Sequence, residues 1–216
     1  MKRMLVFMIF LVMTFSLFGQ DMGLPRPSSK IGVDLLTAIE NRSVARSFIK
    51  KSVSTENLAT ILWAGLGIRG ADAVSSATKA GRNISFSGDT PYINVYVLTN
   101  TGAWKYIPEE NKLQSRSSKD SRTEVSSGTI PSAALMVLFT VDMSLIPPFL
   151  RSNPGMFQQM AHANAGFAAQ NMALTGSALK LSSLIQYSLN PKGAASVLKL
   201  SKDELPLFTL QMGYTE

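Results

Sequence analysis

The sequence of 216 residues contains no cysteine and only one histidine, His162. Without cysteine, the chain cannot form disulfides, zinc–thiolate sites or cysteine nucleophiles. A single histidine excludes a metal cluster built on histidines, and a Ser-His-Asp arrangement would have to use His162 itself. His162 stands among alanines in a long helical pattern, so we expect a hydrogen-bonded histidine that packs against its neighbours.

Nucleotide-binding loops and nucleic-acid-binding patterns are also missing. The sequence has no Walker motif, and Gly65-Leu66-Gly67 lies at the end of a predicted helix, where glycine is typical of a C-cap. The formal net charge is +7, and without Lys2 and Arg3 of a targeting segment 19 basic residues face 14 acidic ones. No dense basic run accompanies this excess. We therefore expect no nucleic-acid partner, and a site for one anionic cofactor explains the charge at least as well.

The first 20 residues have the pattern of a secretory signal peptide. Lys2 and Arg3 precede an apolar run over residues 4–18, which ends at small and polar residues. Leu17 is large for its position before a cleavage site after Gly19, so an uncleaved membrane anchor is the alternative. We expect an exported, periplasmic protein with three parts: a signal peptide at 1–20, a weakly ordered linker at 21–32 and one folded domain at 33–216.

Three stretches have helical periodicity. Leu35, Leu36 and Ile39 share one face of the first, and the second begins at a Ser/Thr cap and repeats apolar residues over 58–66; we expect both helices to face the core. The third and longest, residues 154–181, reads as the central helix, with a place at a subunit interface. Its stripe comprises Met156, Met160, Ala163, Phe167, Asn171, Leu174 and Ala178.

Strand patterns alternate with these helices. Residues 92–99 form a typical strand, and an apolar run over 133–141 indicates a central strand covered on both faces. Residues 112–128 are polar and read as surface. Further elements are expected at 103–107 (strand), 183–187 (strand), 190–198 (helix) and 205–212 (strand). The pattern predicts an α+β fold with a mixed, mainly antiparallel sheet flanked by helices.

The order and spacing of these elements resemble the nitroreductase superfamily, in particular its thiazoline/oxazoline dehydrogenase-like (SagB-type) branch. The resemblance covers about residues 33–214. The pieces that carry it are LLTAIENRSVARSF, STENLATILWAGLGI, INVYVLTN with WKYIPEENKL, AGFAAQNMALTGSAL and VLKLSKDELPLFTLQMGY.

This resemblance implies a homodimer with flavin mononucleotide (FMN) at the subunit interface and hydride transfer from a nicotinamide, NAD(P)H, or from a substrate through the flavin. The family pattern Arg-x-Ser-x-Arg-x-Phe/Tyr, which contacts the flavin, is matched by Arg42, Arg46 and Phe48. Val44 occupies the serine position, and Ser43 lies one residue early. An arginine guanidinium binds phosphate through two parallel hydrogen bonds, whereas two solvated arginines at a helix end are the alternative from the residues alone.

Two further flavin segments are implied by the same resemblance. The loop before the strand at 92–99 aligns with residues 82–91, and the loop whose backbone amides face the flavin aligns with residues 184–188, where Ile185 replaces proline. The cofactor-binding residues expected in these two segments are Arg82, Ser85, Ser87, Asp89, Tyr187 and Ser188. No catalytic acid or base and no metal ligand is expected, because the flavin itself is the reactive group.

Two functions follow as hypotheses. The first is an exported FMN-dependent oxidoreductase that acts on a small molecule by ping-pong hydride transfer. The second is a flavin-free member of the family that serves as a periplasmic binding or structural protein, because several family side chains are replaced. A membrane partner is expected only if the N-terminal segment stays uncleaved.

Overall fold

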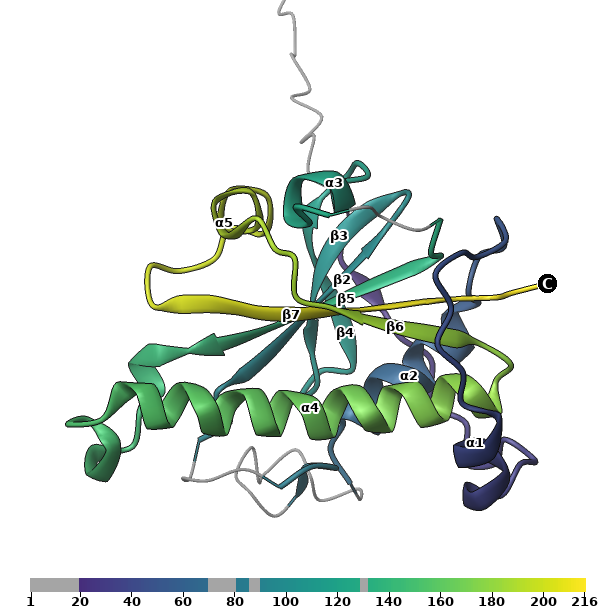
Figure 1. The fold of residues 1–216 in the computed structure, drawn as a ribbon, viewed down its shortest axis with the longest axis horizontal. Coiled ribbons are helices and arrows are strands. Elements are labelled where there is room, and N and C mark those ends of the chain that lie inside the picture. The colour runs from purple at the N-terminus through teal and green to yellow at the C-terminus, as the bar shows by residue number, and fades with distance from the viewer. Residues whose placement is uncertain (1–19, 70–80, 86–89, 129–131) are drawn as a thin grey trace, which may run out of the picture.

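The computed structural model describes residues 20–69, 81–85, 90–128 and 132–216. Its centre is a seven-stranded sheet in the order β1-β4-β3-β2-β5-β7-β6, and every pair of neighbouring strands is antiparallel (Figure 1). The strands are β1 (Met22–Gly23), β2 (Ile93–Thr99), β3 (Gly102–Ile107), β4 (Lys112–Ser117), β5 (Leu135–Asp142), β6 (Ser182–Gln186) and β7 (Glu204–Gly213). The predicted α+β fold is confirmed.

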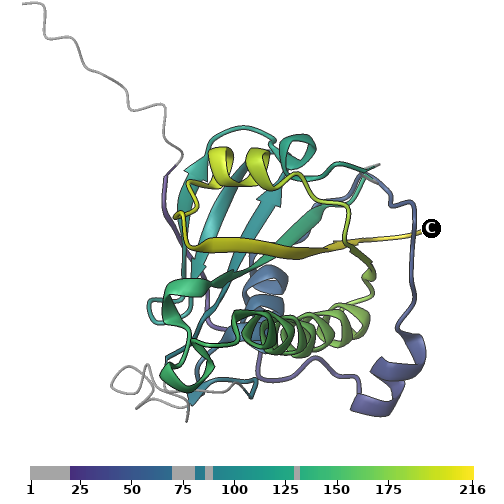
Figure 2. The ribbon, with the colours of Figure 1, turned by 60° about the vertical axis from the view of Figure 1, so that its left-hand side comes forward.

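Helices cover both faces of the sheet, so the domain has three layers. Figure 2 shows the sheet between α4 (Pro154–Ala178) on one side and α5 (Pro191–Leu198) on the other. The helix α2 (Thr55–Leu66) packs on α4, and the short α3 (Arg122–Val125) packs on α5. The central strand β5 is buried along almost its whole length, because it receives side chains from both helical layers.

The helix α2 forms as its sequence predicts. The Ser54 side chain accepts a hydrogen bond from the backbone N–H of Asn57 and so caps the first turn. On its apolar face, Ile61 and Leu62 are fully buried. Gly65 allows a close approach to α4, because a Cβ added there would lie 2.2 Å from Cε of Met172.

The helix α1 (Leu35–Asn41) does not face the core as expected. Leu35, Leu36 and Ile39 are 64%, 75% and 48% exposed, and only Ala38 is buried. Ala38 is the docking point, since its carbonyl accepts a hydrogen bond from Ser177 Oγ of α4 (2.8 Å). The spacing of apolar residues in α1 correctly indicated an apolar face, but it did not indicate whether that face is buried.

The stripe predicted on α4 also lies on the outside. Met156 and Phe167 are 48% and 52% exposed, whereas the opposite face, with Phe157, carries the buried residues. His162 is exposed too, and its Nδ1 lies 2.8 Å from the Gln158 carbonyl oxygen one turn earlier. The expected hydrogen bond is therefore present, and the side chain lies on the exposed face of the helix.

Two polar segments are more ordered than their composition suggests. Met22–Gly23, within the expected linker, pairs with β4, and Ser28 N–H donates to Thr60 Oγ1 of α2 (3.0 Å). Residues 112–128, expected to be surface, contain β4 and α3, with Leu113 fully buried. Within β4 only Leu113 is buried, so the sequence of this strand looks polar. Within the described ranges, no helix combines the length and hydropathy that a membrane span requires.

Candidate functional site

The segment from Arg42 to Arg46 lies along the outer edge of β6. Val44 forms a parallel bridge with Ser183: Ser183 N–H donates to the Ser43 carbonyl (3.2 Å), and Ala45 N–H donates to the Ser183 carbonyl (3.3 Å). The two hydroxyls of Ser43 and Ser182 are 2.8 Å apart and hydrogen-bonded. These contacts hold the two arginines at opposite ends of a short extended segment.

The two guanidinium groups are available to an anion. Arg42 ends α1 and is half-buried, while Arg46 is exposed. Among the described residues, neither side chain has a hydrogen-bond or ion-pair partner. Each guanidinium offers a planar set of N–H donors that matches phosphate. The segment therefore presents two uncompensated positive charges at the sheet edge.

Phe48 anchors this segment to the end of the sheet. Its side chain is 6% exposed and packs so closely on Gly213 that a Cβ there would lie 2.9 Å from the ring. The next residue, Ile49, donates its N–H to the Tyr214 carbonyl (2.9 Å). Phe48 thus belongs to the protein core.

The backbone of β6 contributes a donor within residues 184–188, the segment whose backbone amides the resemblance places against the flavin; sequence reasoning did not say which residue supplies it. Hydrogen-bonded and non-hydrogen-bonded pairs alternate along an antiparallel ladder. Because the backbone of Ser183 bonds outward to residues 43 and 45, Ile185, two positions on, also directs its N–H and C=O away from β7. The outward direction of the Ile185 backbone groups can be inferred only once the hydrogen bonds of Ser183 to residues 43 and 45 are known.

Tyr187 and Ser188 follow directly at the end of β6. Tyr187 is 69% exposed, and its ring centroid lies 5.6 Å from that of Phe208. The Ser188 carbonyl accepts hydrogen bonds from Ser127 N–H (3.1 Å) and Ser126 Oγ (3.3 Å). We name the strip formed by these two segments the β6-edge site; it comprises Arg42, Ser43, Arg46, Ser182, Ile185, Tyr187 and Ser188.

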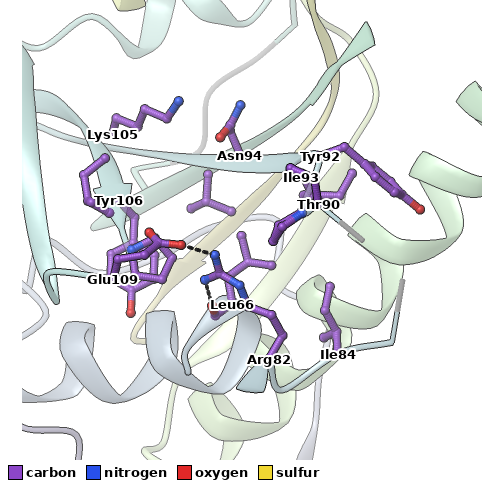
Figure 3. A pocket seen from close by; sticks show the side chains of 14 residues that line it. Leu66, Arg82, Ile84, Thr90, Tyr92, Ile93, Asn94, Lys105, Tyr106 and Glu109 are labelled. Carbon is purple, nitrogen blue, oxygen red and sulfur yellow. Dashed lines mark hydrogen bonds and ion pairs between the residues drawn. The ribbon is translucent and has the colours of Figure 1, made fainter. Parts of the chain in front are cut away.

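Arg82 and Ser85, by contrast, lie away from the β6-edge site in the fold. Arg82 is only 7% exposed; its Nη1 donates to the Leu66 carbonyl (2.9 Å) and its Nη2 pairs with Glu109 in the turn after β3 (Figure 3). The Ser85 carbonyl accepts a hydrogen bond from Asn164 Nδ2 of α4 (2.9 Å). Ser87 and Asp89 lie outside the described residues.

The distance between the α1 segment and residues 82–85 can be estimated along the helix α4, which both contact. The α1 segment meets α4 at Ser177, and Ser85 meets it at Asn164. Thirteen residues of helix at about 1.5 Å each span about 20 Å. Within one chain, the structure brings Arg42, Ser43 and Arg46 together with the end of β6, but it does not bring Arg82 or Ser85 to them.

The comparison with protein families decides the class. The profile described as the nitroreductase family matches residues 39–214. The chain belongs to the nitroreductase family. The resemblance inferred from the sequence is confirmed, and with it the assignment as an oxidoreductase enzyme. No curated protein matches the chain.

Solved structures share the fold at low sequence identity. A protein from Ralstonia eutropha assigned as a nitroreductase superposes with a TM-score of 0.76 at 23% identity, covering 92% of this chain and 90% of that one. The Escherichia coli microcin synthetase McbBCD, in complex with truncated pro-MccB17, gives 0.66 at 16% identity over 89% and 76%. The NADPH:FMN oxidoreductase from Vibrio harveyi, complexed with NAD+, gives 0.54 at 16% identity over 84% and 69%.

The contacts of Arg82 indicate a structural role within its own chain. Replacing it in the variant Arg82→Ala leaves the Leu66 carbonyl without its donor and removes the ion pair with Glu109. We expect the free energy of unfolding to fall by about 2–3 kcal/mol in a urea titration. The exposed Arg26→Ala is the control, with a change within about 0.5 kcal/mol. Weaker FMN binding with unchanged stability would instead make Arg82 a flavin ligand.

Proposed function

We propose that the protein is an FMN-dependent oxidoreductase that passes hydride from a nicotinamide to a small-molecule acceptor in a ping-pong reaction. The observation that carries this proposal is the pair of unpartnered guanidinium groups beside the outward-facing backbone of β6. These groups match the two demands of the cofactor, which are an anion site for its phosphate and hydrogen bonds for the polar edge of its ring.

The residues of the β6-edge site fit this cofactor in charge and in polarity. Arg42 and Arg46 would bind the phosphate or the pyrimidine edge, and the Ile185 N–H would donate to the ring. Val44, Ile185 and Tyr187 are 62%, 44% and 69% exposed. Their apolar side chains would cover a flat ring and exclude water from it. Bound FMN would supply the hydride chemistry, and the protein would supply position and electrostatics.

A nicotinamide is the proposed electron donor. The Vibrio harveyi protein with the same fold is an NADPH:FMN oxidoreductase and is complexed with NAD+. For the present chain, a ping-pong reaction would let donor and acceptor use the same face of the flavin in turn. The proposed acceptor is a small molecule.

A homodimer would explain both the exposed apolar surface and the separation of the flavin segments. Exposed apolar side chains gather on α1, α4 and β6, which all lie on the side facing the viewer in Figure 1. Residues 82–85 are about 20 Å from the α1 segment along α4. A second copy seated on this surface would bury the apolar stripe and could bring its own copy of this loop to the β6-edge site.

Export is proposed from the N-terminal pattern. The described chain begins at Gln20, whose carbonyl accepts a hydrogen bond from Trp104 Nε1 (3.4 Å), and the next residues pair with β4. A cut after Gly19 would therefore release a domain that keeps every described strand of the sheet.

A flavin-free binding or structural protein is the second candidate. It is favoured by the hydrogen bond between Ser43 and Ser182, which occupies the hydroxyl nearest to the family's serine position. The apolar Val44 stands in that position.

Removal of both arginines tests the cofactor. In Arg42→Ala/Arg46→Ala, FMN affinity should fall by about 100-fold, because each lost charge-assisted contact is worth about tenfold. Titration followed by flavin fluorescence measures the affinity, and circular dichroism checks that the domain still folds. The matched control is Arg26→Ala/Arg151→Ala, which removes two exposed arginines elsewhere. Equal affinity of both double variants, or a wild-type protein that binds no added FMN, would support the flavin-free alternative.

The dimer is tested on the outer face of α4. Phe167→Glu places a charge in the proposed interface, so we expect a monomer in sedimentation velocity and a parallel loss of FMN. His162→Glu, about 140° away around the helix, should remain dimeric. A wild-type monomer that binds FMN would contradict a site shared between two copies.

The export proposal predicts a processed N-terminus. Intact-mass measurement of protein from its native compartment should give a chain that begins near Gln20. A mass that includes residues 1–19 would instead show an uncleaved anchor.

A further inference from the structure

The sheet opens between β2 and β3. Their ladder stops at the pair Tyr96–Lys105, although β2 continues to pair with β5 as far as Ile93 and β3 continues to pair with β4 as far as Ile107. A cavity of about 410 Å³ lies at this opening. The volume is within the range of about 300–1,000 Å³ that is typical of small-molecule sites.

The walls of the cavity are mainly apolar, and its polar groups stand at two ends. Ile84, Ile93, Val95 and Ile107 are among the apolar lining residues. In Figure 3, Lys105 and Asn94 lie at one end, and Arg82 with Glu109 lies at the other. This arrangement suits a molecule with an apolar body and a polar group, since each part meets a surface of its own kind.

The charges at the two ends differ. At the Arg82 end, Glu109 neutralises Arg82, whose buried Nε–H has no hydrogen-bond partner. At the other end, Lys105 has no carboxylate partner among the described residues; its Nζ lies 5.8 Å from the ring centroid of Tyr96. Burial raises the pKa of Tyr106, so this lining residue stays neutral. The titratable lining groups therefore sum to one positive charge, at Lys105.

A carboxylate lies near Lys105 without lining the cavity. Glu204 accepts hydrogen bonds from Asn94 Nδ2 (3.0 Å), Tyr96 Oη (2.9 Å) and Thr140 Oγ1 (2.5 Å). All three neutral donors bond the Oε1 atom of this buried carboxylate, and neither of its oxygens forms an ion pair with Lys105 within the described chain. The ammonium group thus remains the cation of the cavity.

We propose that the cavity between β2 and β3 binds a small amphipathic monocarboxylate, with its acid group on Lys105 and its apolar body between the separated strands. Within one chain, the cavity is separate from the β6-edge site, because β2, β5 and β7 lie between β3 and β6 in the sheet. The unpaired Nε–H of Arg82 would donate to an acceptor at the end of the ligand that lies away from Lys105. This inference goes beyond the proposed flavin chemistry and does not depend on it.

The experiment uses two acids of different shape, 1-naphthylacetate and decanoate, and the neutral amide of each. Isothermal titration of the full protein should show saturable binding of at least one acid, with its amide about tenfold weaker. Lys105→Gln should weaken the acid by about tenfold and leave the amide unchanged. Glu109→Gln should strengthen the acid by about threefold, because the charge of Arg82 is then no longer compensated.

Lys112→Gln is the matched control. Lys112 lies on the neighbouring strand, pairs with Glu110 and does not line the cavity. Its removal should leave the affinity for the acid within about twofold of the wild type, since exposed charges are screened. Absence of binding by both acids, equal affinity for acid and amide, or equal effects of Lys105→Gln and Lys112→Gln would each overturn the proposal. FMN binding is measured separately on the same variants, so failure of one proposal is distinguished from failure of the other.

Discussion

The packing of α4 across the sheet is the contact on which the rest of the molecule depends. Its buried face is rich in alanine, which lets the helix approach the sheet and α2 closely. The same helix fixes two distant segments by single hydrogen bonds, the α1 segment through Ser177 and residues 82–85 through Asn164. Tyr92 also donates to Asn164, so the start of β2 is tied to the same point. Because one rigid element carries these contacts, the spacing between the two proposed flavin segments is set by the length of a helix.

The β6 edge and the opening between β2 and β3 carry different chemistry. At the β6 edge, a strand with outward-facing backbone groups is joined by two arginines that have no partner among the described residues. At the opening, Arg82 has the same charge but is buried, paired with Glu109 and hydrogen-bonded to Leu66. An arginine with satisfied donors stabilises its surroundings, whereas an unpaired arginine at an edge can bind a ligand. The environment of each guanidinium, rather than its position in a sequence pattern, therefore separates structure from binding.

The helices and strands that could be predicted from the sequence are those whose own pattern of apolar and capping residues determines their structure. The strands β2 and β5, the helices α2 and α4 and the cap of α5 at Asn190 follow from apolar repeats and capping residues. The prediction failed where burial of a residue depends on which other part of the fold packs against it. Leu35 and Leu36 looked like core residues because their spacing marks an apolar face, and it carries no signal that this face stays exposed in the described part of the chain. β4 looked like surface because only one of its residues, Leu113, is buried.

The candidate site was predictable to a similar extent. The arginines and the segment 184–188 were found through the resemblance, but the sequence does not say which backbone N–H of that segment points outward. The opening between β2 and β3 has no sequence signal either, because both features depend on which residues pair across strands. The residue shift at Ser43 illustrates the same limit. In the sequence it is a hydroxyl out of place, whereas in the structure that hydroxyl bonds Ser182 and helps to hold the segment against β6.

This second role of Ser43 bears on how a flavin would be held. A hydroxyl contact depends on short distances and good alignment, and a shift of one residue removes it. A guanidinium acts over a longer range and has several donors, so it tolerates a change in its neighbours. If Ser43 fixes the backbone between the two arginines, the segment keeps its charges in place without the family's serine. Retention of both arginines and of the pairing with β6 therefore favours a cofactor held mainly by charge over a site that has lost its ligand.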